Sequence, residues 1–370
     1  MMYMNEITLP LKQPLSLASG ETVGRSDDAV IIRFPGRRNV LSTSWMNGGY
    51  REDLEAVFNH QMSLAACDTC HAGNGSVQQY LDGVARNLGL DPETATGLIT
   101  RAEMKNTAVV TESFREVTVT AIVTAGIEKN GGRAGDPASF CENGESVEPV
   151  GGTINTILLI NADLPEYAMT RAVMTATEAK AAALQQLMAR SIYSTGIATG
   201  SGTDMIVIVA DPGSSQHLTN TGKHSKLGEL IGRTVIRATT AALEMETGLS
   251  PESQRDVLMR LSRFSVSEED LWKIAAGSSG CDPGNPDKRE AFLCALRSWS
   301  QDPYAVARVA AALHVVDEAE WGLISGMDAC RTIDLIIGNH DRHGFSSCDN
   351  ESLLHAVCVA VVEEIEMSMP

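Results

Sequence analysis

A carboxylate and an ammonium lie close together in "TATEAK" (175–180), and a second carboxylate ends the glycine-containing run "ATGSGTD" (198–204). Glu178 and Lys180 fall in a predicted helix, whereas Asp204 directly precedes an apolar strand. Carboxylates can accept a proton and an ammonium can donate one, so these side chains are candidates for general acid–base chemistry. Two helical positions differ by about 200° of rotation, so Glu178 and Lys180 point to different sides of the helix. A solvated pair of surface charges is the alternative interpretation.

The turn before Asp204 is a candidate binding site for an anion or an oxyanion. Its two glycines and the hydroxyls of Thr199 and Thr203 would let backbone N–H groups face such a charge. The run does not match the GxxxxGKS/T phosphate-binding pattern. The alternative is a tight turn in which Asp204 accepts backbone hydrogen bonds.

Two polar residues share one face of a predicted strand in "GTINT" (152–156). Thr153 and Asn155 are two positions apart, and alternate residues of a strand point the same way. Asn is depleted in strands, so Asn155 either contacts a ligand or bonds the backbone of a neighbouring loop. The residues alone therefore indicate a polar site at the element ends between residues 124 and 232, and they leave the reaction open.

Histidines and cysteines raise the question of a metal. His224 precedes Ser225, a candidate helix cap, and could act as an acid, a base or a ligand. The string "CDTCH" (67–71) has the form of a haem-attachment site, or with His60 could bind zinc. No second CxxC completes a zinc site, so we interpret the string as a turn with ordinary thiols, and "NHDRHG" (339–344) as a polar loop. We therefore predict no resident cofactor or metal.

Strands and helices are mixed along the first 250 residues. This mixture predicts an α/β or α+β fold, with a layered core of a mixed β-sheet and flanking helices. "DPET" (91–94) could cap a further helix. From residue 251 onward helical segments dominate, so we expect a catalytic domain at 1–250 and a mainly helical C-terminal extension at 251–370. We predict strands at 29–34, 39–44, 116–126, 152–164 and 204–211, and helices at 76–90, 165–191 and 225–248.

The overall charge excludes some classes of partner. The net charge is −18 and the isoelectric point is about 4.8, which disfavours non-specific binding to nucleic acid or to anionic membranes. No stretch approaches the roughly 18 apolar residues of a membrane helix, and the N-terminus lacks the pattern of a secretory signal. We expect a cytoplasmic protein with free thiols.

A series of segments, in this order along the chain, resembles the adenosylcobinamide amidohydrolase family of cobamide salvage. The resemblance covers roughly residues 35–245 and excludes the C-terminal third. One difference is Ser201, where the family more often has Thr. The segments are "RNVLSTSWMNGG" (38–49), "VFNHQ" (57–61), "TAGIEKNGGRAGDP" (124–137), "GTINTILLINADL" (152–164), "AMTRAVMTATEAKAAAL" (168–184), "ATGSGTD" (198–204) and "HSKLGELIG" (224–232).

The resemblance implies hydrolysis of the amide that joins the aminopropanol arm to the corrin ring of adenosylcobinamide, giving adenosylcobyric acid and 1-amino-2-propanol. The corrinoid would be the ligand, and a homo-oligomer is compatible with the sequence. A corrinoid carrier without catalysis is the alternative.

Roles for individual residues in this reaction are hypotheses. They take Glu178 or Asp204 as the base and His224 or Lys180 as the proton donor. Thr199 and Thr203 are expected to contact the oxyanion or the substrate, and Thr153 to contact the substrate. A nucleophilic Thr153 or Thr199 stays open, as does a metal-bound water at His60, Asp204 and His224. The residues expected to bond the amide side chains that rim a corrin are Asn47, Asn59 and Asn155.

Overall fold

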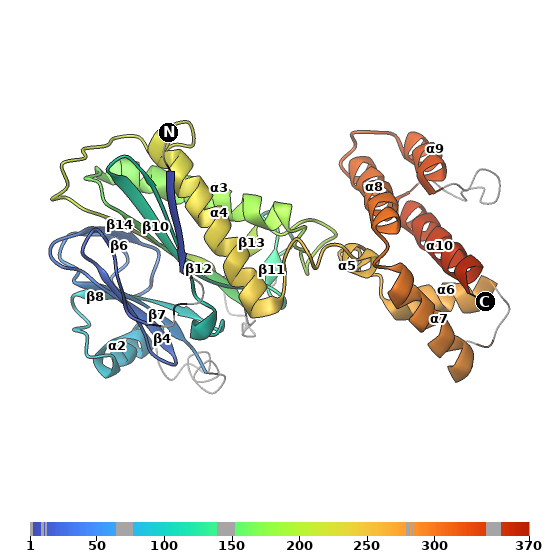
Figure 1. The fold of residues 1–370 in the computed structure, drawn as a ribbon, viewed down its shortest axis with the longest axis horizontal. Coiled ribbons are helices and arrows are strands. Elements are labelled where there is room, and N and C mark those ends of the chain that lie inside the picture. The colour runs from blue at the N-terminus through green and yellow to red at the C-terminus, as the bar shows by residue number, and fades with distance from the viewer. Residues whose placement is uncertain are drawn as a thin grey trace. The chain divides into compact units, whose positions relative to one another are not determined.

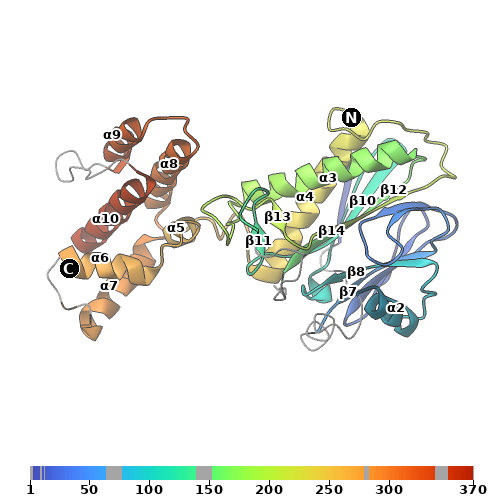
Figure 2. The same ribbon diagram turned by 180° about the vertical axis from the view of Figure 1, so that it is seen from behind.

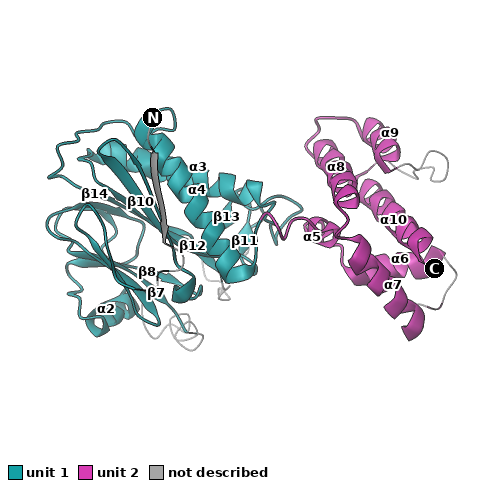
Figure 3. Cartoon of the chain, viewed as in Figure 1, with its two compact units in different colours: residues 1–250 teal, residues 251–370 magenta. Residues whose placement is uncertain are grey.

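The computed structural model describes residues 3–8, 11, 13–63, 77–138, 152–278, 282, 284–337 and 349–369. The chain forms two compact units, Met1–Ser250 and Pro251–Pro370, which Figure 3 draws in different colours. The strings "CDTCH" (67–71) and "NHDRHG" (339–344) lie outside the described residues, so the interpretations given to them stay predictions.

Unit 1 is built on a seven-stranded mixed sheet. Its strands run in the order β1 (Tyr3–Thr8), β9 (Ala108–Phe114), β10 (Val117–Gly126), β12 (Thr153–Ile160), β14 (Met205–Ala210), β5 (Asn39–Ser42) and β6 (Gly49–Arg51). Only the pair β12 and β14 is parallel, and the other neighbours in this sheet are antiparallel. All eight residues of β12 are buried, as expected for a strand covered on both faces.

Two long helices cover one face of this sheet, α3 (Glu166–Gln186) and α4 (Lys226–Thr247), as Figures 1 and 2 show. The buried stripe of α3 is mostly alanine, which lets the helix pack closely on its neighbours. Helix α4 begins where the Ser225 hydroxyl accepts a hydrogen bond from the Gly228 N–H. It ends at Gly248, whose φ of 72° is the left-handed conformation that favours glycine.

A second sheet packs against the opposite face of the first. It contains β2 (Leu15–Ser16), β3 (Thr22–Arg25), β4 (Ala29–Arg33), β7 (Ala56–Gln61) and β8 (Ala95–Thr100) in that order. One apolar cluster joins the sheets, with Val57 and Leu98 from the second and Ile157 and Val207 from the first. Helix α2 (Val77–Asn87) covers the outer face of the second sheet. The layers are therefore helices, sheet, sheet and helix, and the α/β class with a mixed sheet is confirmed.

The sequence periodicity correctly predicts the central strands of the first sheet but misses part of the second sheet. The predicted strands at 29–34, 39–44, 116–126, 152–164 and 204–211 are β4, β5, β10, β12 and β14. The helix expected after "DPET" is wrong, because residues 95–100 form β8, parallel to β7. The glycine and threonines of this segment weaken its strand pattern in the sequence. Its packing against β7 and β12 stabilises the strand conformation.

Unit 2 is helical, as the sequence predicts. Its helices are α5 (Val257–Ser262), α6 (Glu268–Ser278), α7 (Pro286–Trp299), α8 (Pro303–Glu320), α9 (Gly326–Ile337) and α10 (Asn350–Ser368). They enclose a separate apolar core, in which the rings of Trp272 and Phe292 lie 5.7 Å apart. Within this core Arg263 forms a two-bond ion pair with Asp317. Across the described part of the chain, no helix has the length and apolar character to span a bilayer.

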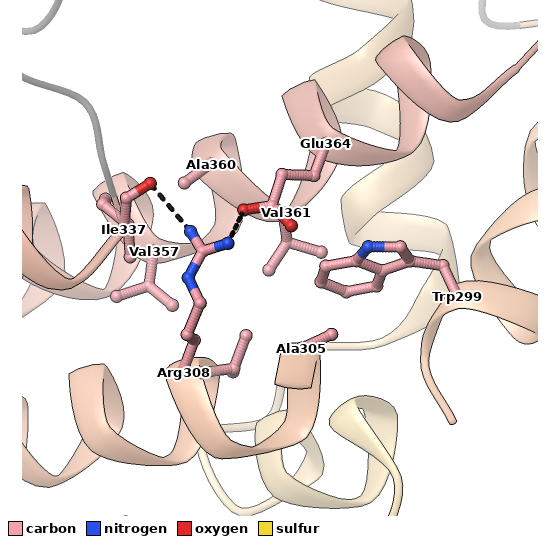
Figure 4. A pocket seen from close by; sticks show the side chains of 9 residues that line it. Trp299, Ala305, Arg308, Ile337, Val357, Ala360, Val361 and Glu364 are labelled. Atoms are coloured by element: carbon pink, nitrogen blue, oxygen red, sulfur yellow. Dashed lines mark hydrogen bonds and ion pairs between the residues drawn. The ribbon is translucent and has the colours of Figure 1, made fainter. Parts of the chain in front are cut away.

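A small pocket in unit 2 lies between α8, α9 and α10 (Figure 4). There the Arg308 guanidinium donates to the Ile336 and Ile337 carbonyls at the end of α9 and pairs with Glu364 at 2.5 Å. The pocket has a volume of about 10 Å³, which leaves room for about one water molecule, so it is a gap in the packing rather than a ligand site.

Candidate functional site

A partly buried ion pair joins helix α3 to the start of β14. The Lys180 ammonium donates to Oδ2 of Asp204, and the two side chains are only 14% and 13% exposed. These residues are 24 positions apart in the chain. They meet because α3 connects the parallel strands β12 and β14 and lies over them, which brings Lys180 above the first residue before β14.

The Asp204 carboxylate is held by further hydrogen bonds. Oδ1 accepts from the Ile154 N–H at 2.8 Å and from the Ser201 hydroxyl at 2.6 Å. Oδ2 accepts from the Ser201 N–H at 3.0 Å in addition to the bond from Lys180. Hydrogen bonds to an ionised group are short and strong, so this carboxylate is fixed in direction before any substrate binds.

Gly200 is required by this arrangement. A Cβ atom on Gly200 would lie 2.3 Å from Asp204 Oδ2 and 2.6 Å from Lys180 Nζ. Both distances are shorter than non-bonded contacts allow, so any side chain here would push the ion pair apart. The glycine lets the backbone of the 198–204 turn pass directly beside the two charges.

Three chain segments converge on this turn. Strand β13 (Gly200–Ser201) pairs with β11 (Gly131–Gly132). The Asn130 side-chain amide donates to the Gly152 carbonyl at 3.0 Å and to Thr203 Oγ1 at 3.3 Å. Sequence reasoning did not single out Asn130, although it lies in the glycine-rich segment 124–137 that carries part of the family resemblance.

The predicted threonines lie in this turn or bond to it, each with a different partner. Thr153 is 3% exposed and donates to the Thr203 carbonyl at 2.7 Å. Thr203 is exposed and donates to the Gly152 carbonyl at 3.0 Å. Thr199 is partly buried and accepts from the Ala134 N–H at 2.9 Å. The structure therefore gathers Lys180, Asp204 and these threonines into one cluster.

Two other predicted catalytic residues lie on the surface. Glu178 pairs with Lys223 at 2.6 Å, and the two side chains are 51% and 64% exposed. His224 is exposed in the segment that leads into α4. Glu178 and Lys180 thus occupy different sides of α3, as the helical rotation predicts.

The predicted asparagines are held by contacts within the fold. Asn59 donates to Thr124 Oγ1 and accepts from the Asn155 side-chain amide, each at 2.8 Å. These two asparagines are 4% and 1% exposed, between the two sheets. Asn47, which has a φ of 50°, donates to the Pro92 and Ala95 carbonyls. Their contacts with a substrate stay predictions.

The structure does not assemble the residues of the metal-bound water alternative. His60 is 8% exposed, and its Nε2 lies 2.8 Å from the Tyr80 hydroxyl. Burial lowers the pKa of His60 below its usual value. Among the described residues no group of three or more His, Cys, Asp or Glu side chains could hold a metal ion. His60, Asp204 and His224 are all described, so they do not form such a group.

Two open hollows of unit 1 are lined by residues outside the Asp204 cluster. One of about 580 Å³ is bordered by Asn39 and Tyr50, and one of about 660 Å³ by the turns at 33–37, 52–56 and 89–95. Asn39 pairs with Ala210 at the end of β14, whereas Asp204 precedes its start. A strand of six residues spans about 20 Å, so the hollow at Asn39 is well removed from the Asp204 carboxylate.

A comparison with known protein families covers the whole of this cluster. The family described as adenosylcobinamide amidohydrolase matches residues 14–251. An uncharacterized protein of Methanocaldococcus jannaschii is 38% identical over 227 residues, which are 58% of this chain and 85% of that protein. The adenosylcobinamide amidohydrolase of Methanosarcina mazei is 28% identical over 228 residues, 59% of this chain and 96% of that protein.

A solved structure of a protein from Pyrococcus horikoshii also matches, at 13% identity and a TM-score of 0.29. The match covers 65% of this chain and 83% of that one. A likeness this low has no bearing on the fold or the function.

Proposed function

The chain belongs to the adenosylcobinamide amidohydrolase family, and we propose on this premise that it hydrolyses the aminopropanol amide of adenosylcobinamide. The products would be adenosylcobyric acid and 1-amino-2-propanol. The observation that carries the proposal is the family match over residues 14–251, which contains every residue of the Lys180–Asp204 cluster. A cytoplasmic location and a homo-oligomer belong to the same proposal as expectations.

Amide hydrolysis makes three chemical demands. A water or a side chain must attack the carbonyl carbon, the oxyanion that forms must be stabilised, and the departing nitrogen must receive a proton. The cluster contains a group for each demand. Asp204 is an oriented carboxylate, and Lys180 is an ammonium in contact with it. The Ser201 N–H is bonded to Asp204, so the backbone N–H that we propose for the oxyanion is that of the exposed Gly202 in the same turn.

We assign the proton transfers to Asp204, whose carboxylate Lys180 holds in place, rather than to Glu178 and His224. The reason is burial, since the Lys180–Asp204 pair is mostly withdrawn from water whereas Glu178 and His224 are exposed. Electrostatic interactions are stronger where water is excluded, so charges that develop during the reaction are stabilised more by the buried pair. Thr199 and Thr203 border the turn and are proposed to contact the substrate.

A product assay tests the proposal directly. Purified full-length protein is incubated with adenosylcobinamide, with and without a chelator, and both products are measured by mass spectrometry. We expect both products in both reactions. Corrinoid that binds without release of aminopropanol would instead establish a carrier and overturn the proposed hydrolysis.

Two variants connect the activity to the cluster. Lys180→Met and Asp204→Asn should each reduce turnover by at least about 100-fold, the lower end of what general acid–base groups contribute. The matched control is Asp163→Asn, which alters another ion pair of the same unit, at 2.8 Å with His217. It should retain wild-type turnover. Glu178→Gln and His224→Gln retaining wild-type turnover would support the assignment, whereas loss of activity in either would move the proton transfer to that residue.

A further inference from the structure

We infer that Ser201 is the nucleophile that attacks the amide carbonyl, an inference that rests on the proposed function. It follows from comparing the hydroxyls of the Asp204 cluster. Thr153 and Thr203 donate to the backbone carbonyls of Thr203 and Gly152, and Thr199 accepts from a backbone N–H. Ser201 differs from these threonines because it donates to a carboxylate, Asp204 Oδ1, at 2.6 Å.

The contact of Ser201 has the geometry of a nucleophile with its base. A separation of 2.6 Å lies in the range of a charge-assisted O–H···O⁻ bond, which prepares the hydroxyl proton for transfer. The base is in turn oriented by a third group, since Lys180 and the Ile154 N–H hold the Asp204 carboxylate. A nucleophile, a base and an orienting group in sequence are the arrangement of covalent hydrolases.

Access to Ser201 also favours this role. Ser201 is partly exposed, whereas Thr153 is 3% exposed and closed to a substrate. The next residue, Gly202, is exposed, and among the residues that the structure describes a Cβ built there would meet only Asn130 Oδ1, at 3.6 Å. We expect a carbonyl group to approach the turn on this exposed side.

The proposed step transfers the acyl group twice. Ser201 Oγ forms a bond to the carbonyl carbon while its proton moves to Asp204, and the carbon–nitrogen bond then breaks. The proton returns from Asp204 to the departing nitrogen, so aminopropanol leaves as a neutral amine and an ester remains on Ser201. Water then attacks the ester with its proton passing through Asp204 back to Ser201 Oγ, which yields the corrinoid acid. The sum is one amide and one water giving one acid and one amine.

Competition between water and a second nucleophile tests the ester. Wild-type protein is given hydroxylamine together with either adenosylcobinamide or the analogue whose arm is ethanolamine. If both substrates form the same ester on Ser201, the ratio of corrinoid hydroxamate to corrinoid acid should be identical for the two leaving amines. A ratio that depends on the leaving amine, or acid alone, would overturn the inference while leaving the hydrolysis itself established. If wild-type protein releases no amine at all, the proposed function fails as well.

Variants of Ser201 provide a second readout. Ser201→Ala should reduce turnover by about 1,000-fold or more with little change in KM, since the attacking atom is removed. Ser201→Thr keeps the hydroxyl and should remain within about tenfold of wild type. Ser113→Ala is the matched control, because Ser113 is another partly buried serine whose hydroxyl bonds a side chain, that of Thr118 at 2.9 Å. Wild-type turnover in Ser201→Ala would refute the nucleophile.

Discussion

Removing Asp317 should destabilise unit 2 more than removing its partner Arg263. The two side chains are each 5% exposed, and their two hydrogen bonds measure 2.9 and 2.6 Å. Taking away one member of such a buried pair typically costs about 3–5 kcal/mol, because the other charge is left without compensation. A guanidinium cannot release its proton in a protein, whereas a lone carboxylate can be neutralised by gaining one. The cost of Asp317→Ala should therefore lie at the upper end of this range.

The surroundings of Arg263 increase this asymmetry. Its guanidinium lies over the ring of Phe264, 4.2 Å from the centroid, a contact that does not replace a counter-ion. The pKa of the neighbouring Arg260 is lowered, mainly because that side chain is partly buried and to a smaller extent because of the charge on Arg263. In Asp317→Ala these two cations would remain close together, and Arg263 would lack its carboxylate partner.

Urea unfolding of the full-length protein measures this cost. Three of the four tryptophans, Trp272, Trp299 and Trp321, belong to unit 2, so tryptophan fluorescence reports mainly on that unit. We expect Asp317→Ala to lose about 4–5 kcal/mol, Arg263→Ala about 3, and the double variant Arg263→Met with Asp317→Leu to recover most of the loss. An Asp317→Ala variant within 1 kcal/mol of wild type, or a double variant no better than Asp317→Ala, would refute this reasoning.

Three further outcomes concern unit 1. Gly200→Ala should lower turnover at least as much as Asp204→Asn, because the new methyl group displaces the Lys180–Asp204 pair, and steady-state kinetics measure it. Burial raises the pKa of Glu246, so the stability contributed by its protonated form is fully present at low pH and is lost as the pH rises through the raised pKa. Glu246→Gln should make this decline with pH smaller, as measured by urea unfolding midpoints between pH 4 and 8. Gly97→Ala should destabilise the protein by more than about 2 kcal/mol, because the new Cβ would lie 2.1 Å from the Phe58 ring. Gly83→Ala within α2, where the new Cβ has no atom of the described residues within 4 Å, should instead stabilise it by up to about 1 kcal/mol, and thermal unfolding measures both.

The sequence predicts the central layer of unit 1 because its elements have unmixed patterns. Residues 117–126 and 153–160 are rich in β-branched side chains, and α3 carries a regular stripe of alanine. Strand β7 is harder to recognise, since "VFNHQ" places Asn59 and His60 inside a buried strand. Those polar residues are tolerated only because Asn155 and Tyr80 provide partners from distant segments.

The candidate site is predictable in its residue types but not in its pairings. The position of Asp204 before a buried strand and the opposite directions of Glu178 and Lys180 follow from local periodicity. The contact between Lys180 and Asp204 depends on how α3 packs over two parallel strands, which no local pattern contains. The same holds for the bond from Ile154 to Asp204, since it spans 50 residues.

The separation of the two hydrophobic cores has an evolutionary consequence. The core of unit 2 draws its described members from residue 257 onward, and the family match ends at residue 251. A gene that lost or gained its last third at this junction would leave each core whole, so such events carry little risk of producing an unfolded chain. Substitutions in the core of unit 2 should likewise leave the apolar cores of residues 14–251 intact.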